Sequence, residues 1–316
     1  MLCKYFNQSK DNLWTRKPMN TEQIDKRYED LDIRSNDEII KILINDQIDK
    51  FNLLLNYKHD ISTAAAALAN RLKKSSTGRL VYAGAGTSGR LGVLDSAELF
   101  PTFGWKKERS TFLLAGGIES LTTSIEGAED REEEAVHQIK NIEIDERDAL
   151  VAISASGSTP FTLAACDAAR RSGALTISIV NNKPSPLFDA AEHPIAIETG
   201  SEPIAGSTRL SAGTIQKIVL NSLSTLTMIR LNRTYGAYMV DVKPTNKKLK
   251  ERAVRMISEI CLVDQNKAQQ SLIDAKNNPK LAVLIAKGLS VDKAKYLLNL
   301  SNGNLREAIG KKFSNS

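Results

Sequence analysis

Two glutamates, Glu98 and Glu129, have neighbours that favour acid–base chemistry. Glu98 stands in SAELF, among small and apolar residues, and Glu129 stands in EGAED. A carboxyl group with few charged neighbours can have a raised pKa and exchange protons near neutral pH. For either glutamate alone, a solvated or helix-capping carboxylate is the commoner role. Whether the two glutamates act together depends on the strands, loops and helices that position them.

The first of these elements is a glycine-rich turn. Residues 79–83 form a short β-branched and aromatic run of strand type, and an apolar helical pattern follows from Leu91. Between them lies GAGTSG, which contains Gly86, Thr87 and Ser88. A strand, a glycine turn and a helix direct free backbone N–H groups and the helix dipole at one point. We expect an anion site there, most naturally for a phosphate.

A second loop repeats this arrangement after the strand ALVAIS. Ser154 ends that strand, and Ser156, Ser158 and Thr159 precede Pro160, a residue favoured at the first position of a helix. A single loop of this kind can be ordinary helix capping. Two hydroxyl-rich loops after two strands of one sheet favour a ligand that bears a phosphate.

The glycines of the first turn also satisfy the dinucleotide fingerprint, Gly84-x-Gly86-x-x-Gly89. That fingerprint expects a carboxylate at the end of the second strand, about twenty residues further on. Here the second strand ends in AGG, and no carboxylate follows before Glu119. The sequence therefore disfavours a nicotinamide enzyme.

A third cluster, ETGSEPIAGSTR at residues 198–209, follows the last expected strand and opens a long helix. Ser207 can cap that helix, and Arg209 can bind a carboxylate or a phosphate. All three histidines lie outside the three loops, which makes histidine catalysis less attractive.

Strands and helices alternate through the middle of the chain, which predicts a parallel α/β sheet with helices on both faces. Ligands of such sheets bind beyond the carboxyl ends of the strands. The expected strands are 79–83, 110–115, 149–154, 175–180 and 195–199. The expected helices are 37–57, 61–74, 91–100, 121–140, 161–172, 210–231 and 247–261, with a short turn at 187–191.

The pattern divides the chain into three parts. Residues 1–20 are polar and predicted to be a flexible extension. Residues 21–262 are predicted to form the α/β domain with its N-terminal helices. Residues 263–316 are predicted to form a small C-terminal domain of three helices, separated by glycines.

The composition is that of a soluble globular protein, with 41% hydrophobic and 25% charged residues among 316. The net charge is +6, but basic and acidic residues are interleaved, so a solvated surface is favoured over nucleic-acid binding. The three cysteines have no metal or redox spacing, which fits a reducing cytoplasm. No apolar run has the length of a signal peptide or a membrane span, so we expect a cytoplasmic protein that binds no membrane.

Five blocks together resemble the N-acetylmuramic acid 6-phosphate etherases, which are sugar-isomerase-type α/β proteins related to the glucokinase regulatory protein. The resemblance runs from about Thr21 to the C-terminus. The blocks are GAGTSGRLGVLDSAE, IEGAED, ASGSTP, GSTRLSAGTIQKIVLN and MVDVKPTNKKLKERAVRMI. This likeness implies a flavodoxin-like, doubly wound parallel sheet with a small C-terminal helical domain. It also implies homodimers with sites near the subunit interface, and no metal or redox cofactor.

That family cleaves the lactyl ether of its amino-sugar phosphate by syn elimination and addition of water. The resemblance therefore implies a carbon–oxygen lyase of cell-wall amino-sugar catabolism that forms N-acetylglucosamine 6-phosphate and D-lactate. The ring-opened sugar has an aldehyde at C1, which makes the hydrogen at C2 acidic. Glu129 is then the expected base at C2, and Glu98 the acid that protonates departing lactate and later delivers water. The hydroxyl loops would hold the 6-phosphate and sugar hydroxyls, and Arg209 the lactyl carboxylate.

Two positions depart from the family pattern. Ser158 stands where the loop usually has a basic residue, and Ser211 stands where the family usually has lysine. Both changes remove positive charge near an anionic ligand. They favour, as an alternative, a non-catalytic sugar-phosphate-binding regulatory protein on the same scaffold, whereas Glu98 and Glu129 oppose it. A sugar-phosphate isomerase is a further alternative, since it needs only the base at C2.

Overall fold

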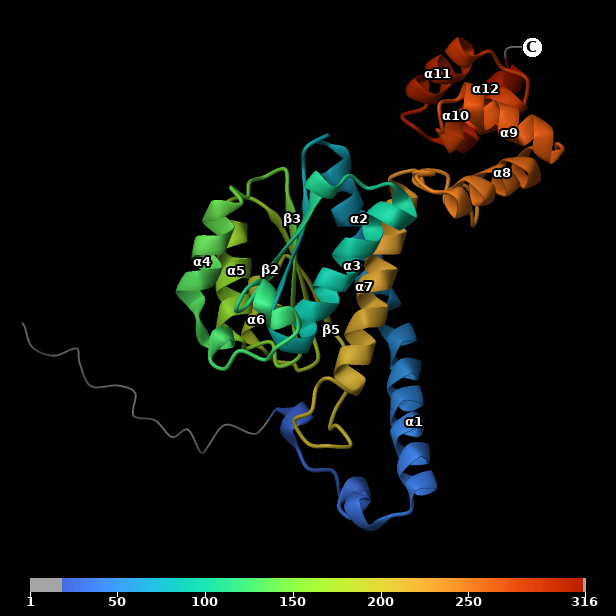
Figure 1. The fold of residues 1–316 in the computed structure, drawn as a ribbon. Helices are drawn as coiled ribbons and strands as arrows, with labels where there is room; N and C mark the ends of the chain where they lie inside the picture. Colours follow the sequence, from blue (N-terminus) through green and yellow to red (C-terminus); the bar gives the residue numbers. More distant parts are fainter. Residues whose placement is uncertain (1–18, 315–316) are drawn as a thin grey trace, which may run out of the picture.

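The computed structural model describes residues 19–314, with side chains through Lys311. Residues 1–18, which make up most of the predicted extension, lie outside the described residues. The described chain forms a three-layer α/β unit and a separate helical lobe (Figure 1). No described helix is both long enough and apolar enough to cross a membrane.

The centre of the α/β unit is a five-stranded parallel sheet in the order β2-β1-β3-β4-β5. This order confirms the flavodoxin-like expectation. Because β1 lies between β2 and β3, the loops that leave β1 and β3 diverge to opposite faces and open a crevice at the carboxyl ends. The strands are β1 (Leu80–Gly84), β2 (Ser110–Leu114), β3 (Ala149–Ser154), β4 (Leu175–Val180) and β5 (His193–Ala196). Only the last differs clearly from its expected range.

Successive strand residues point to opposite faces, and each face carries its own apolar core. Tyr82 belongs to the first core and its neighbour Val81 to the second. The first core lies under α2 (Lys58–Lys73), α3 (Gly86–Phe103) and α7 (Ser211–Arg230). The second lies under α4 (Glu132–Asn141), α5 (Pro160–Arg171) and α6 (Pro186–Ala190). The two groups of helices lie on opposite sides of the sheet in Figure 1.

The helix expected over 121–140 is wrong in its first half. The chain there makes two short 3-10 turns, η6 (Ile118–Leu121) and η7 (Ala128–Asp130), before α4 begins at Glu132. Gly127 between them has φ +67°, a left-handed conformation that a right-handed helix cannot contain. Glu129 therefore lies on a turn that follows β2 and not on a helix.

A long helix, α1 (Asn36–Leu53), precedes the sheet and packs against α7. It begins with a capping box in which Ser35 and Glu38 exchange hydrogen bonds. The remaining short 3-10 segments are η1 (Asn20–Glu22), η2 (Lys26–Tyr28), η3 (Leu31–Ile33), η4 (Leu54–Tyr57) and η5 (Lys107–Arg109).

The C-terminal lobe has a third apolar core. Four helices follow residue 263 where three were expected, and the chain turns between the second and third of them at Gly288, where φ is +92°. They are α9 (Gln265–Asp274), α10 (Pro279–Ala286), α11 (Val291–Leu300) and α12 (Leu305–Ser314). The core also includes residues of α8 (Lys247–Cys261), so the predicted boundary at 263 falls inside one packed unit.

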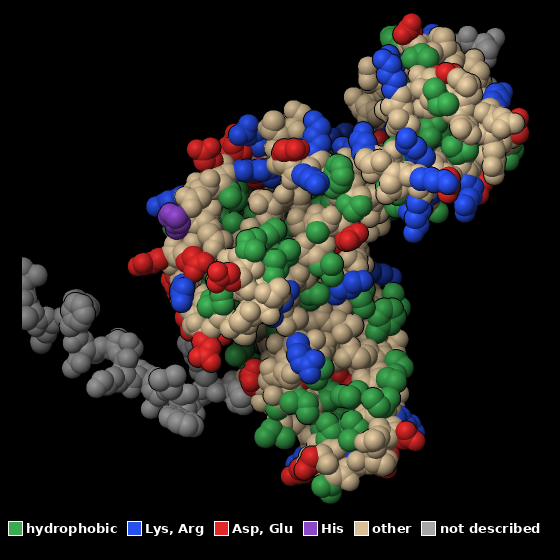
Figure 2. Space-filling model, in the orientation of Figure 1, with side chains coloured by type: hydrophobic (Ala, Val, Ile, Leu, Met, Phe, Trp, Pro, Cys, Tyr) green, Lys and Arg blue, Asp and Glu red, His purple; other side chains and the backbone are tan. Residues whose placement is uncertain are grey.

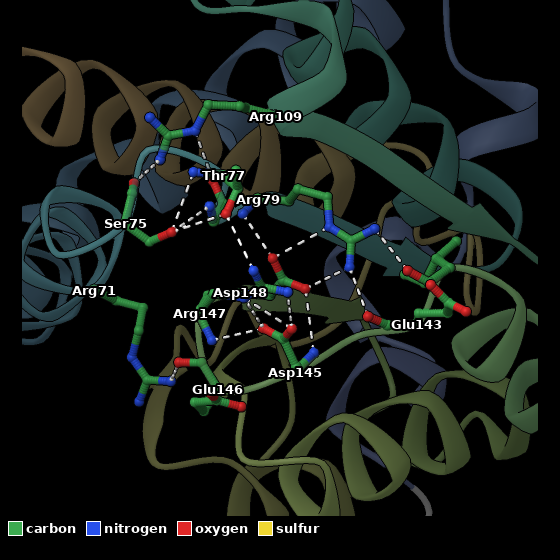
Figure 3. A network of polar contacts seen from close by, with 12 residues as sticks. Arg71, Ser75, Thr77, Arg79, Arg109, Glu143, Asp145, Glu146, Arg147 and Asp148 are labelled. Atoms are coloured by element: carbon green, nitrogen blue, oxygen red, sulfur yellow. Dashed lines mark hydrogen bonds and ion pairs between the residues drawn. The ribbon is translucent and has the colours of Figure 1, made fainter.

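A polar network joins β1 and β3 at their amino ends, opposite the crevice (Figure 3). Arg79 forms an ion pair with Asp148 at 2.6 Å, and its backbone N–H donates to the same carboxylate at 2.7 Å. Arg109 donates to the backbone carbonyls of Leu72, Ser75 and Gly78. These contacts anchor the start of β1 to its neighbours, so the network serves the fold and not the crevice.

Candidate active site

The loops after β1 and β3 are neighbours, because the two strands pair directly. The first loop runs straight into α3, whose N-terminus has no side-chain cap. The backbone N–H groups of its first turn, at Gly86, Thr87 and Ser88, are therefore available to a ligand. Gly86 has φ +52° and an added Cβ there would meet no atom within 4 Å, so this turn is open to solvent.

Three hydroxyl groups cluster in the second loop. Ser154 Oγ lies 2.8 Å from Thr159 Oγ1 and 3.2 Å from Ser156 Oγ. Neither Ser158 nor Thr159 caps α5 through its side chain, so the alternative of ordinary helix capping is wrong for this loop. Ser158 is exposed, and its N–H donates to Ser156 Oγ at 3.1 Å. A cluster of hydroxyls beside an uncapped helix start is a suitable binding site for phosphate oxygens.

Ser88 has a different role from the one its sequence suggested. Its side chain is buried, and its Oγ donates to Gln216 Oε1 at 2.9 Å. Gln216 in turn donates to Asn181 Oδ1 at 2.9 Å, and Asn181 donates to the carbonyl of Ile197. The hydroxyl of Ser88 thus joins α3 to α7 and β4, and only its backbone N–H is left for a ligand.

Sequence reasoning missed this buried network. Asn182, next to Asn181, donates to the carbonyl of Ala155 and to Thr21 Oγ1. The signal was the polar pair NN placed directly after the apolar strand β4, at the carboxyl end of the sheet. Gln216 gave a weaker signal, as a lone amide among the apolar residues of a long helix.

The third loop meets the first through the start of α7. A Cβ added at Gly213 would lie 3.3 Å from Thr87 Cγ2, so the first turns of α3 and α7 are in contact. Ser207 does not cap α7, contrary to expectation. Instead the buried carboxylate of Glu202 accepts hydrogen bonds from the N–H groups of Ser211 and Ala212, at 2.9 and 2.8 Å. Arg209 is exposed and forms no ion pair with any described residue, so its guanidinium is open to an anion.

The two departures from the family pattern lie in different surroundings. Ser211 is fully buried, and its hydroxyl lies between Gln47 and Asp46 of α1. That position faces another helix and not the crevice. Of the two positions, only Ser158 lies on an exposed loop, where a basic side chain could contact a ligand.

Glu129 lies on η7, which packs against α5, the helix that follows the hydroxyl loop. Its side chain is exposed and has no hydrogen bond or ion pair with any described residue. The preceding turn, η6, is bound to α3 through Arg90, whose Nε donates to the carbonyl of Ser120 at 2.9 Å.

Glu98 is placed further away. It is exposed on α3, twelve positions after Gly86, which is about 18 Å of helix at 1.5 Å per residue. It too has no partner among the described residues. Neither glutamate lines the cavities of about 510 and 400 Å³, which lie beside α9–α11 and beside β5. Neither of these two cavities therefore brings the two carboxylates together within a single chain.

Models of two related domains match this chain. The glucokinase regulatory protein N-terminal SIS domain matches residues 61–170, and the SIS domain matches residues 119–226. Together the two ranges cover the five strands and the loops described above. Among solved structures, a phosphoheptose isomerase from Francisella tularensis aligns with 62% of this chain and 100% of its own, with a TM-score of 0.49 and 16% identity.

The curated relatives are much closer in sequence. An N-acetylmuramic acid 6-phosphate etherase from Deinococcus radiodurans is 42% identical over 93% of this chain and 96% of its own length. One from Oceanobacillus iheyensis is 42% identical over 91% of this chain and 97% of its own. Identity of this level over nearly the whole length is sufficient to assign a family. The chain belongs to the N-acetylmuramic acid 6-phosphate etherase family.

Proposed function

We propose that this protein cleaves the D-lactyl ether of N-acetylmuramic acid 6-phosphate and releases N-acetylglucosamine 6-phosphate and D-lactate. The observation that carries the proposal is the meeting of two uncapped helix starts and a hydroxyl cluster at the β1/β3 crevice, in a chain of this family. A phosphate there would accept hydrogen bonds from the first turn of α3 and from Ser154, Ser156 and Thr159.

The reaction needs a base and an acid that act on neighbouring carbons. Glu129 removes the proton from C2 of the ring-opened sugar, next to the C1 aldehyde. The bond between C3 and the lactyl oxygen then breaks, and Glu98 protonates that oxygen so that lactate leaves. Water adds to C3 of the unsaturated aldehyde and C2 regains a proton, which restores the sugar. Each acid–base role contributes roughly 10²- to 10⁴-fold to the rate.

We assign the contact face of a homodimer to α1 and α3. Large apolar side chains along α1 and the start of η4 are at least half exposed: Ile40, Ile44, Ile48 and Phe51 of α1, and Leu55 of η4. Figure 2 shows hydrophobic side chains gathered over this helix. An exposed apolar stripe of this kind is typical of an interaction surface, and most soluble oligomers are symmetric homo-oligomers.

The homodimer also accounts for the position of Glu98. Leu94, one turn before it, is 50% exposed, so the outer face of α3 presents an apolar side chain beside the carboxylate. Contact through this face would bring Glu98 of the partner subunit to the loops of the first chain. We propose that each site combines Glu129 of one chain with Glu98 of the partner subunit.

The test is an assay for D-lactate with N-acetylmuramic acid 6-phosphate as substrate. We expect Glu98→Gln to stop lactate release yet allow deuterium exchange at C2, and Glu129→Gln to abolish both. Glu126→Gln, in the same exposed turn, is the matched control and should retain activity. Exchange at the wild-type rate in Glu129→Gln would show that another group is the base.

A non-catalytic regulatory protein is the second candidate, because Ser158 replaces the basic residue of the exposed loop. It predicts no lactate, but an increase in melting temperature when N-acetylmuramic acid 6-phosphate binds. Lactate release at a rate that depends on Glu129 excludes it.

A further inference from the structure

A buried ion pair lies on α1, on the side away from the apolar stripe. Lys50 Nζ is 2.6 Å from Asp46 Oδ1, and the two side chains are 7% and 2% exposed. They are one helical turn apart. Burial of two charges is costly, and replacement of such a pair by apolar residues is often neutral or stabilising. Stability alone therefore does not explain why this ion pair is buried here.

Lys50 has a second partner, in the loop of residues 198–209. Its Nζ donates to the backbone carbonyl of Ser201 at 2.6 Å. The next residue, Glu202, holds the first turn of α7 through the N–H groups of Ser211 and Ala212. Lys50 thus fixes the loop at Ser201, next to Glu202, whose carboxylate binds the first turn of α7.

Asp46 completes the connection from the other side. Its Oδ2 accepts a hydrogen bond from Ser211 Oγ, and its Oδ1 accepts one from Tyr28 at 2.8 Å. Gln47 donates to Ser211 Oγ at 2.9 Å. The chain is therefore bound to α1 on both sides of residues 202–210, at Ser201 and at Ser211, the first residue of α7.

Ser207 and Arg209 lie between these two fixed residues, Ser201 and Ser211. Neither is held by an ion pair or a side-chain hydrogen bond among the described residues, so the position of Arg209 depends on the loop backbone. A charged hydrogen bond to a backbone carbonyl is stronger than a neutral one, which suits a contact that must hold a loop.

We propose that Lys50 is a positioning residue for substrate, which acts through the carbonyl of Ser201 to hold Arg209 at the anion site. This inference rests on the proposed function. Lys50 is buried and its ammonium is engaged by Asp46 and Ser201, so it does not contact the ligand itself. Loss of Lys50 should weaken substrate binding and leave the chemical step largely intact.

The experiment separates positioning from charge balance with four variants. Lys50→Met removes the anchor and leaves Asp46 as an unpaired buried charge. The double variant Asp46→Asn/Lys50→Met removes the anchor but leaves no unpaired charge. Lys50→Arg keeps a cation and is the conservative variant. Lys41→Met, at an exposed position on the same helix, is the control. For each, we would measure KM and kcat for lactate release, the melting temperature, and hydrogen exchange of residues 198–210 without ligand.

We expect Lys50→Met to raise KM about tenfold, the size of one charged hydrogen bond, with little change in kcat. Exchange of residues 198–210 should become faster and the melting temperature should fall. The double variant should regain melting temperature but keep the high KM and the fast exchange. Lys50→Arg should restore KM in part, and Lys41→Met should match the wild type.

Two results would overturn the inference. One is a wild-type KM and wild-type exchange in Lys50→Met. The other is recovery of the wild-type KM and the wild-type exchange in the double variant, which would mean that Lys50 only neutralises the charge of Asp46. Failure of the proposed function is distinguishable, because the wild-type protein would then release no lactate at all. The exchange of residues 198–210 would still show whether Lys50 holds the loop.

Discussion

Ser88 on α3 donates a 2.9 Å hydrogen bond to Gln216 on α7, and Gln216 donates another to Asn181 at the end of β4. The three side chains are buried and their partners lie within the protein. This chain of contacts sets the spacing between the first turns of α3 and α7. Because those turns line the crevice, the geometry of the proposed anion site depends on the buried amide of Gln216.

Gln216→Leu should therefore affect both stability and binding. Ser88 Oγ and Asn181 Oδ1 would each lose a buried partner, which should cost about 2–4 kcal/mol in the free energy of unfolding. Urea denaturation measures that loss, and KM for the sugar phosphate should rise in parallel. Gln216→Glu, which keeps an acceptor for Ser88, is the comparison. An unchanged unfolding midpoint in Gln216→Leu would contradict the role of this network.

The shared site can be tested by subunit mixing. Glu98→Gln and Glu129→Gln should each be inactive as homodimers. If the two carboxylates of one site come from different chains, a mixed dimer has one intact site and one site with both changes. Random mixing in equal amounts should then restore roughly a quarter of wild-type activity, as expected for a two-fold symmetric dimer. Absence of any recovery, with mixed dimers demonstrated by mass spectrometry, would place both glutamates of a site on one chain.

Ser158→Arg restores a basic side chain to the exposed hydroxyl loop. It should lower KM by about two- to fivefold, because an exposed charge pair contributes at most about 1 kcal/mol. The gain should decrease at high salt. The free energy of unfolding should not change, since Ser158 is exposed and only its backbone N–H is used. Ser172→Arg, at an exposed position beyond α5, controls for net charge. A KM that rises would show that position 158 does not face the anion.

Asp148→Asn should affect stability alone. Asp148 is 2% exposed and balances Arg79 at the amino ends of the strands, far from the crevice. Loss of its charge should lower the free energy of unfolding by about 2 kcal/mol, less than for a fully buried pair because Arg79 is partly exposed. KM should stay at the wild-type value. A change in KM would mean that the two ends of the sheet are coupled.

Cys166 makes stability depend on alkaline pH. Burial raises the pKa of its thiol from the usual 9.0 to about 12. The unfolded chain therefore releases this proton above pH 9 while the folded chain keeps it, and stability present below pH 9 is lost as pH rises toward 12. Relative to Cys166→Ala, the wild-type free energy of unfolding should fall by up to about 1.4 kcal/mol per pH unit in that window. Parallel curves for the two proteins between pH 9 and 11 would contradict this.

The sequence by itself determined the repeated strand–loop–helix units and the chemistry of their loops. Glycines and hydroxyls at fixed places after β1 and β3 are local signals, because backbone freedom and helix starts depend on neighbouring residues. The blocks around Glu98 and Glu129 likewise indicated the family. Local signals were less reliable where a single glycine redirected the chain, as at Gly127 and Gly288.

Only the tertiary structure decided which of these residues face a ligand. Ser88 and Ser211 are hydroxyl residues beside a loop in the sequence, yet both side chains are buried in contacts with distant elements. The partners that occupy them, Gln216 and Asp46, are 128 and 165 positions away. Such pairings follow from the packing of α3 and α1 against α7. No local pattern encodes them, because they depend on how whole helices pack.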